Sequence, residues 1–111
     1  MSYRPKGMPA RFMEGAPESV RAGVLDIFAV TPAAPLDFDV VLSAPVTDVE
    51  TGELYGFNGV DFSASGARGC HFFLNPHQTR AYRESNRRKR VAWSDLPEPT
   101  QKAVLAYLES D

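Results

Sequence analysis

The sequence predicts an α+β domain: a small antiparallel β-sheet of about four short strands in a meander, followed by two C-terminal α-helices and preceded by an extended N-terminal arm. Three observations support this prediction. Short apolar runs rich in β-branched and aromatic residues alternate with turn signals through the middle of the chain. A helix N-cap signal and an amphipathic segment follow them. Proline and glycine are dense near the start. With 111 residues the chain fits one domain.

Residues 1–19 are expected to form the arm, and residues 20–111 the single domain. Prolines and two glycines oppose regular structure in the arm, and its apolar residues either fix it to the domain or reach a partner. The prolines are Pro5, Pro9 and Pro17, and the apolar residues are Met8, Phe12 and Met13. We expect the arm to be poorly packed in the free protein.

The apolar runs between turn signals define the strands. The expected strands are Val24–Val30, Phe38–Ser43, Leu54–Phe57, Val60–Phe62 and Cys70–Leu74. A short helix from Glu18 to Phe28 competes with the first of them. Pro32 and Pro35 break the chain after it, and Pro45 is expected to stop the second strand, because proline has no N–H for the strand ladder. The last strand is expected to be buried.

Two turn signals connect these strands into hairpins. In Glu50–Glu53, Gly52 stands where a type I turn with a G1 bulge needs a positive φ, so this segment is expected to be a hairpin tip. Asn58-Gly59 is the favoured dipeptide of a type I′ turn and predicts a second tip. If only one tip forms, Asn58-Gly59 is instead a bulge in a longer strand.

Two helices are expected after the strands. Asn75 is a typical N-cap, Pro76 suits the first helical position, and Gln78 completes a capping box, so a helix should run from Pro76 towards Arg88. The last helix should follow Leu96–Pro99. Both helices are expected to cover the same face of the sheet. The expected core residues near the C-terminus are Trp93, Leu96, Val104, Tyr107 and Leu108. Trp93 could alternatively anchor a protein interface.

Composition restricts the class of protein. Hydrophobic residues make up 43% of the chain and charged residues 23%, which is ordinary for a soluble globular protein. The single cysteine cannot form an intrachain disulfide. No apolar run approaches the ~20 residues of a membrane span. These features predict a cytoplasmic protein that does not bind membranes.

Charge is separated into blocks along the chain, although the net charge is only −2. Residues 22–67 contain seven acids and no Lys or Arg, whereas residues 68–90 contain seven bases and one acid, Glu84. The acids are Asp26, Asp37, Asp39, Asp48, Glu50, Glu53 and Asp61, and the bases are Arg68, Arg80, Arg83, Arg87, Arg88, Lys89 and Arg90. Such a charge distribution acts on association and partner choice rather than on the fold.

The basic block contains the densest functional signal, the run Arg87–Arg90. Four adjacent cations point in different directions around a helix, so we expect them to face solvent or a partner. Tyr82 lies between Arg80 and Arg83, a mixture compatible with phosphate contact and base stacking. A solvated helix end, a polyanion site and a site for an acidic protein surface are all compatible with this pattern.

The acidic block could form a complementary surface. The candidates are Asp37, Asp39, Asp48, Glu50 and Glu53, at exposed sheet positions and hairpin tips. Such acids are often only solvated, but they could also contact a basic groove of a partner. A third possibility is that the basic helix of this chain docks against its own acidic sheet.

Motifs for catalysis or for a cofactor are weak. The spacing after Asp48 fails the calcium-loop pattern, because Glu53 and Gly59 stand where that loop needs Gly and Glu. Cys70 and His71 should point to opposite faces of a strand, and with His77 they do not form a zinc pattern. We expect Cys70 to be a small buried hydrophobe and His71 to lie on the wetter face of the sheet. No catalytic residue, metal or cofactor is predicted.

The sequence therefore predicts a small non-enzymatic binding protein, of an accessory or inhibitor type, with separate acidic and basic surfaces. Its expected partner is another protein or a protein–nucleic-acid complex. Direct nucleic-acid binding through the Arg-rich helix at residues 80–90 is the alternative hypothesis. The oligomeric state, and the question whether the two charged blocks pair within the molecule, stay open at this level.

Overall fold

The structure of the protein is a computed structural model that describes residues 5–31, 37–66 and 70–110. Pro32, Pro35 and Arg68 lie outside these residues. The described elements are η1 (Ala10–Met13), α1 (Glu18–Gly23), β1 (Val24–Ala29), β2 (Asp37–Thr47), β3 (Leu54–Ser63), β4 (Cys70–Leu74), α2 (Pro76–Ser85), η2 (Arg87–Lys89), η3 (Trp93–Asp95) and α3 (Glu98–Glu109), where η marks a 3-10 helix. The predicted fold class is confirmed: an antiparallel four-stranded sheet precedes two C-terminal helices in one α+β domain.

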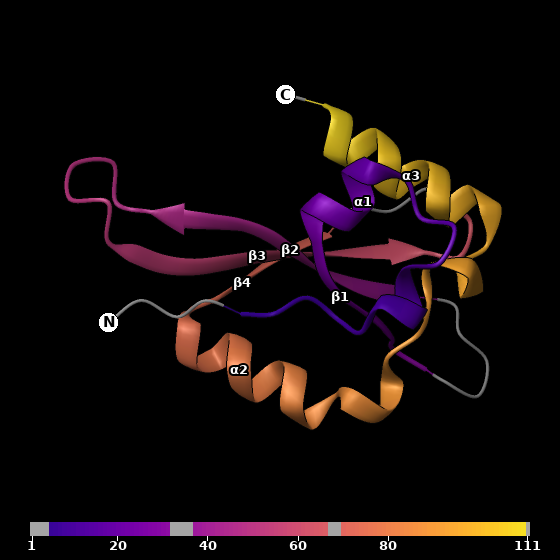
Figure 1. Cartoon of the computed structure of the whole chain (residues 1–111), viewed down its shortest axis with the longest axis horizontal. Helices are drawn as coiled ribbons and strands as arrows, with labels where there is room; N and C mark the ends of the chain where they lie inside the picture. Colours follow the sequence, from indigo (N-terminus) through magenta and orange to yellow (C-terminus); the bar gives the residue numbers. More distant parts are fainter. Residues whose placement is uncertain (1–4, 32–36, 67–69, 111) are drawn as a thin grey trace.

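The sheet is a simple meander in which each strand pairs antiparallel with the next, in the order β1-β2-β3-β4. The far ends of β2 and β3 form a hairpin arm, residues 45–57, whose tip projects past the helices (Figure 1). Gly52 at the tip has a φ of +74°, and its N–H donates to the Asp48 carbonyl at 2.9 Å. The hairpin tip predicted at Glu50–Glu53 is therefore confirmed.

Two other turn predictions are wrong. Pro45 does not stop the second strand, because the register between β2 and β3 shifts between Val41 and Pro45, and an irregularity of this kind tolerates a missing N–H. The tip at Asn58-Gly59 does not form. The alternative of a longer strand is correct, because both residues lie inside the continuous strand β3, although its pairing with β4 has no bulge there. Gly59 serves a close approach instead, because a Cβ there would lie 2.1 Å from the Phe72 ring.

The two C-terminal helices cover opposite faces of the sheet, contrary to the expectation that both would cover one. Val40 and Val41 are neighbours on β2, yet they belong to different hydrophobic clusters. Val104 of α3 belongs to the first cluster, and Tyr82 of α2 packs against the second. Figure 1 shows α1 and α3 on one side of the sheet and α2 on the other. Since all six residues of β1 are buried, its sequence is that of a strand covered on both faces.

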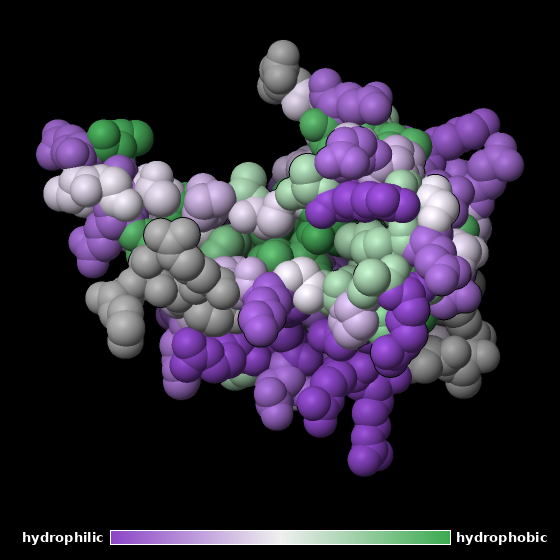
Figure 2. Space-filling view, viewed as in Figure 1, coloured by the Kyte–Doolittle hydropathy of each residue, from purple (hydrophilic) through white to green (hydrophobic). Residues whose placement is uncertain are grey.

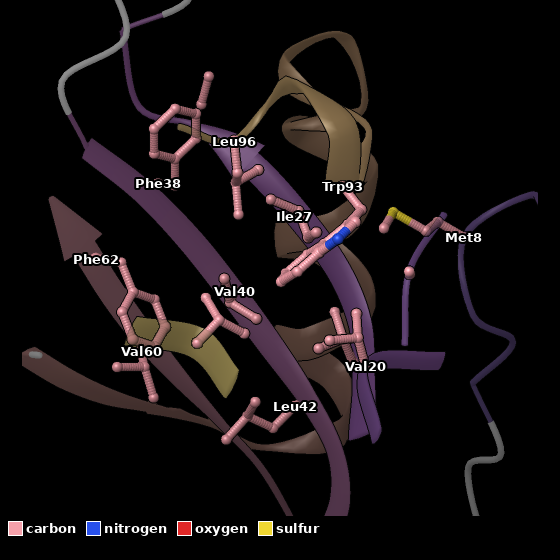
Figure 3. Close-up of a cluster of buried hydrophobic side chains, with 14 residues drawn as sticks. Met8, Val20, Ile27, Phe38, Val40, Leu42, Val60, Phe62, Trp93 and Leu96 are labelled. Carbon is pink, nitrogen blue, oxygen red and sulfur yellow. The ribbon is translucent and has the colours of Figure 1, made fainter. Parts of the chain in front are cut away.

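The larger cluster forms the main core between the sheet and the layer of α1 and α3 (Figure 3). Trp93, Leu96 and Val104 are buried, as predicted, whereas Tyr107 and Leu108 are only partly buried at its margin. Trp93 is 5% exposed, so it is a core residue and not an exposed interface anchor. The other buried members are Met8, Ala16, Val20, Val24, Ile27, Ala29, Phe38, Val40, Leu42, Val60 and Phe62.

The N-terminal segment is packed on the domain, so the expectation of a poorly packed arm is wrong for the described residues. Met8 is 7% exposed, and its N–H donates to the Leu25 carbonyl at 3.0 Å. Ala16 is also buried, and Phe12 packs against the same core. Prolines prevent long helices here, but they do not prevent an extended chain from burying apolar side chains. The competing helix and strand predictions are each partly right, because α1 ends where β1 begins.

Strand β4 is less buried than predicted. Cys70 and His71 are exposed, and Phe73 is 46% exposed. The last strand of a meander has a neighbouring strand on one side only, so an apolar sequence does not ensure burial there. The prediction of Cys70 as a buried hydrophobe is therefore wrong.

A matched pair of substitutions tests the core. Val104→Ala is expected to lower the free energy of unfolding by about 2 kcal/mol, because Val104 is 1% exposed and the change leaves a cavity. Val49→Ala at the hairpin tip, where the side chain is 100% exposed, should cost less than about 0.5 kcal/mol. Urea denaturation measures both values, and equal losses would contradict the described packing. Leu108→Ala should have a smaller effect than Val104→Ala, since Leu108 is only partly buried.

Candidate anion-binding groove

The acidic and basic blocks meet at a buried ion triad beneath α2. Asp26 of β1 is 0% exposed, and both of its carboxylate oxygens accept hydrogen bonds from arginine. Arg83 of α2 donates from Nε at 2.7 Å, and Arg90 donates from Nε at 2.6 Å and from Nη2 at 2.9 Å. The chain's own basic segment therefore docks on its acidic sheet, which was one of the alternatives left open by the sequence.

A β-irregularity and a helix end bring these three residues together. The register of β1 shifts between Val24 and Asp26. Helix α2 ends at Ser85, and after η2 the backbone at Arg90 is extended (φ −63°, ψ 134°) and bridges to Phe28. The four cations of the basic run are thus not arranged around one helix. The prediction that all of them face outward is wrong for Arg90, whose side chain is only 14% exposed.

Tyr82 is also turned into the protein. Its hydroxyl donates to Asp39 Oδ2, and its ring packs edge-on against Phe28, with centroids 5.6 Å apart, and at a tilt against Phe72. Burial, helped by the hydrogen bond to Asp39, raises the pKa of Tyr82 far above the ordinary value for tyrosine. Tyr82 is therefore a packing residue and is not presented for base stacking.

A groove opens above the triad, with a volume of about 500 Å³. Its lining residues come from the N-terminal segment, from α2 and from the chain just after α2. They are Lys6, Gly7, Pro9, Arg80, Arg83, Glu84, Arg87 and Arg90. Figure 2 shows hydrophilic side chains gathered along the lower side of the molecule, over α2. Sequence reasoning predicted Arg80, Arg83, Arg87 and Arg90 as binding residues, and the structure brings all four to this groove.

The basic residues differ in how they are held. Arg88 and Lys89 are exposed on η2 and do not line the groove. Arg90 is confined further by Phe12 and Phe28, whose ring centroids lie 5.9 Å and 6.0 Å from its guanidinium carbon. The groove therefore combines two arginines fixed by Asp26 with more exposed cations such as Arg87.

The acidic candidates are not gathered on one surface. Asp39 is bound by Tyr82, and Asp37 lies at the start of β2. Asp48, Glu50 and Glu53 are together at the tip of the hairpin arm. A single acidic face, as the sequence block suggested, does not form, because β2 and β3 carry its members to different parts of the sheet.

Asp48 holds the tip together. Its Oδ1 accepts the N–H groups of Glu50 and Thr51 at 2.7 and 3.0 Å, and its Oδ2 accepts the Tyr55 hydroxyl at 2.6 Å. Hydrogen bonds donated to a carboxylate stabilise its charged form and lower its pKa. They lower the pKa of Asp48 to about 2, and the bond from Tyr55 is the largest cause.

This bond gives a pH prediction. Because the folded pKa of Asp48 lies below its unfolded value, its contribution to stability is full above about pH 4 and is lost as the pH falls through about 2. We expect Tyr55→Phe to raise the pKa of Asp48 as followed by NMR titration of its carboxyl carbon. Val49→Ala, a change of a fully exposed side chain at the same tip, is the matched control and should leave the pKa of Asp48 unchanged. An Asp48 titration that Tyr55→Phe leaves unaltered would contradict the contact.

The remaining reactive side chains lie apart from the groove. His71 Nε2 lies 2.9 Å from the Tyr107 hydroxyl, on the face covered by α3. Cys70 and His77 are exposed on β4 and α2. Among the described residues no three His, Cys, Asp or Glu side chains are grouped so as to hold a metal ion.

Asp26 and Lys6 are charged residues of the site that sequence reasoning did not single out. Asp26 was counted only as a member of the acidic block, although a lone acid within the apolar run Val24–Val30 is a signal for a buried, paired charge. Lys6 carried no such signal, because only the packing of the N-terminal segment brings it to the groove.

Comparison with protein families, with curated proteins and with solved structures gave no match. In the described part of the chain, no helix is both long and apolar enough to cross a membrane.

Proposed function

We propose that this protein is a small non-enzymatic binding protein of an accessory or regulatory type, and that its basic groove binds an acidic segment of a partner protein. The observation that carries the proposal is the convergence of five cations on one recess. Lys6, Arg80, Arg83, Arg87 and Arg90 all line it. Glu84 in the lining and Asp26 behind it offset two of these charges, which leaves +3 among the described residues.

The support for binding rather than catalysis is the chemistry of the lining. Arginine stays protonated at all physiological pH values and is suited to hold an anion, not to exchange protons with it. Asp26 fixes two of the guanidinium groups before any ligand arrives, and such preorganisation lowers the entropic cost of binding. We therefore propose a recognition site and no enzymatic activity.

The support for a protein partner over nucleic acid comes from the aromatic residues. Tyr82 is partly buried and packs against Phe28 and Phe72, and no aromatic residue is among the described residues that line the groove. Single-stranded nucleic acids are held largely by base stacking on aromatic rings, which the described part of the lining does not offer. The acids at the hairpin tip would also repel a long polyanion. Nucleic-acid binding through residues 80–90 is kept as the competing outcome of the test.

The proposal includes a cytoplasmic location. A chain with one cysteine has no internal disulfide that would need an oxidising compartment.

A binding experiment tests the proposal with a short peptide of alternating glutamate and glycine, and with single-stranded and duplex oligonucleotides, at physiological salt. The peptide should bind, and the double variant Lys6→Ala/Arg87→Ala should weaken its binding about fivefold, because two exposed ion pairs worth about 0.2–1 kcal/mol each would be lost. Isothermal titration calorimetry measures the affinities. Arg21→Ala/Lys102→Ala is the matched control, since it removes the same two residue types from α1 and α3 and should leave binding unchanged.

Two results would contradict the proposal. One is tighter binding of an oligonucleotide than of the peptide, with a steep salt dependence that the Lys6→Ala/Arg87→Ala variant reduces. That result would favour the nucleic-acid hypothesis. The other is peptide binding that both double variants weaken equally, which would mean that net charge and not the groove holds the peptide.

A further inference from the structure

We infer that the groove is built for a phosphoryl group, so that the partner segment it binds carries a phosphorylated side chain among its acids. The inference rests on the proposed function and names its ligand more closely. It is carried by the two arginines that Asp26 holds, by the charge of the recess and by the residue types that line it.

The bonds to Asp26 leave both fixed arginines able to bind a ligand. A guanidinium has five N–H donors. Arg90 uses two of them on Asp26, and Arg83 uses one on Asp26 and one, at 3.4 Å, on the Leu25 carbonyl. Three N–H groups therefore remain on each guanidinium after these bonds. Both residues line the groove, so two arginines whose guanidinium groups are held by Asp26 border one recess.

A phosphoryl group matches this recess better than a carboxylate does. The described residues of the recess have a net charge of +3 when Glu84 and Asp26 are counted. One carboxylate brings one charge and two oxygens, whereas a phosphate monoester brings about −1.5 to −2 and three acceptor oxygens on one centre. Guanidinium forks bind such oxygens in pairs. Several carboxylates could supply the same charge only by crowding together, against their mutual repulsion.

The ligand itself would make the binding depend on pH. The second pKa of a phosphate monoester is about 6, so its charge falls towards −1 as the pH drops below that value. A glutamate side chain keeps its charge until about pH 4.3. Among the described residues, the charged groups that line the groove are Lys6, Arg80, Arg83, Glu84, Arg87 and Arg90, with Asp26 behind them, and neither histidine of the chain is in this lining. A loss of affinity near pH 6 would thus report the phosphate and not a protein group.

The experiment compares three blocked peptides that differ at one position: Gly-Glu-X-Glu-Gly, where X is phosphoserine, glutamate or serine. At pH 7.5 the phosphoserine peptide should bind at least about tenfold more tightly than the glutamate peptide, a difference of about 1.4 kcal/mol. Its affinity should fall between about pH 7 and pH 5 while that of the glutamate peptide stays nearly constant. Lys6→Ala/Arg87→Ala should reduce the preference for phosphoserine, and Arg21→Ala/Lys102→Ala should keep it.

The outcomes separate this inference from the proposed function. Equal affinity for the phosphoserine and glutamate peptides, lost in the groove variant, would overturn the inference and leave the proposed function standing. A phosphoserine preference that the groove variant retains would also overturn it, because the phosphate would then bind elsewhere. No binding of any peptide at about 1 mM would overturn both. A 5′-phosphorylated oligonucleotide that binds more tightly than the phosphopeptide would overturn the assignment to a protein segment.

Discussion

Asp26→Ala is expected to lower the free energy of unfolding by about 3–5 kcal/mol, the usual cost of breaking a buried ion pair by removing one partner. Asp26 is fully buried, while the side chains of Arg83 and Arg90 are only 13% and 14% exposed. Without the carboxylate, two guanidinium groups of like charge would lie together in a region with little water. Since small domains have about 5–15 kcal/mol of stability in total, this one change should remove a large part of it.

Chemical denaturation measures this loss, and two variants serve as controls. Arg87→Ala changes an exposed cation of the same groove and should cost less than about 0.5 kcal/mol. The triple variant Asp26→Leu/Arg83→Met/Arg90→Leu replaces all three charges with apolar groups, and we expect it to recover most of the stability, because buried ion triads are often replaced without loss. The triple variant should nevertheless bind the acidic peptide more weakly. If Asp26→Ala lowered the free energy of unfolding by no more than Arg87→Ala does, the prediction would be wrong, and water would have to screen the charges of the triad.

Trp93→Ala is expected to lower the free energy of unfolding by about 3–5 kcal/mol, as truncation of a buried aromatic residue does. Trp93 is 5% exposed and lies in the main core beside Met8 and Ile27 (Figure 3). The cavity would be bounded by the sheet, by the N-terminal segment and by α3. Helix α3 is also bonded to the backbone at Trp93, because the Gln101 side chain donates to the Trp93 carbonyl at 2.9 Å. The substitution should therefore loosen several layers together.

The control at this position is Trp93→Phe, which keeps most of the apolar volume and should lose clearly less stability than Trp93→Ala. Thermal unfolding followed by circular dichroism ranks the two variants without relying on the fluorescence of the removed side chain. Since Met8 packs in the same cluster, Trp93→Ala should also make the N-terminal segment easier to cleave by protease. A Trp93→Ala variant as stable as the wild type would contradict the core position of this residue.

Local signals in the sequence determined the elements that depend on a few neighbouring residues. The Asn75 side chain accepts the Gln78 N–H at 2.7 Å, and the Gln78 side chain accepts the Asn75 N–H at 2.9 Å, so the predicted capping box is confirmed. Gly52 at the hairpin tip and Val104 on the buried face of α3 are confirmed in the same way. Each of these features is encoded within a turn or two of the chain, where residue type and spacing act directly.

Tertiary structure alone decided which of these elements face one another. Asn58-Gly59 has the local preference of a turn, but pairing of β3 with strands on both sides keeps it extended, and Phe72 occupies the space beside Gly59. The candidate groove depends on still longer contacts, because Asp26 and Arg90 are 64 residues apart in the sequence. Charge counting identified both blocks, yet only the packing of α2 and of the chain after η2 against β1 could decide that one acid turns inward and holds two of the bases. Such a pairing depends on the burial of all three groups at once, which no local window of sequence contains.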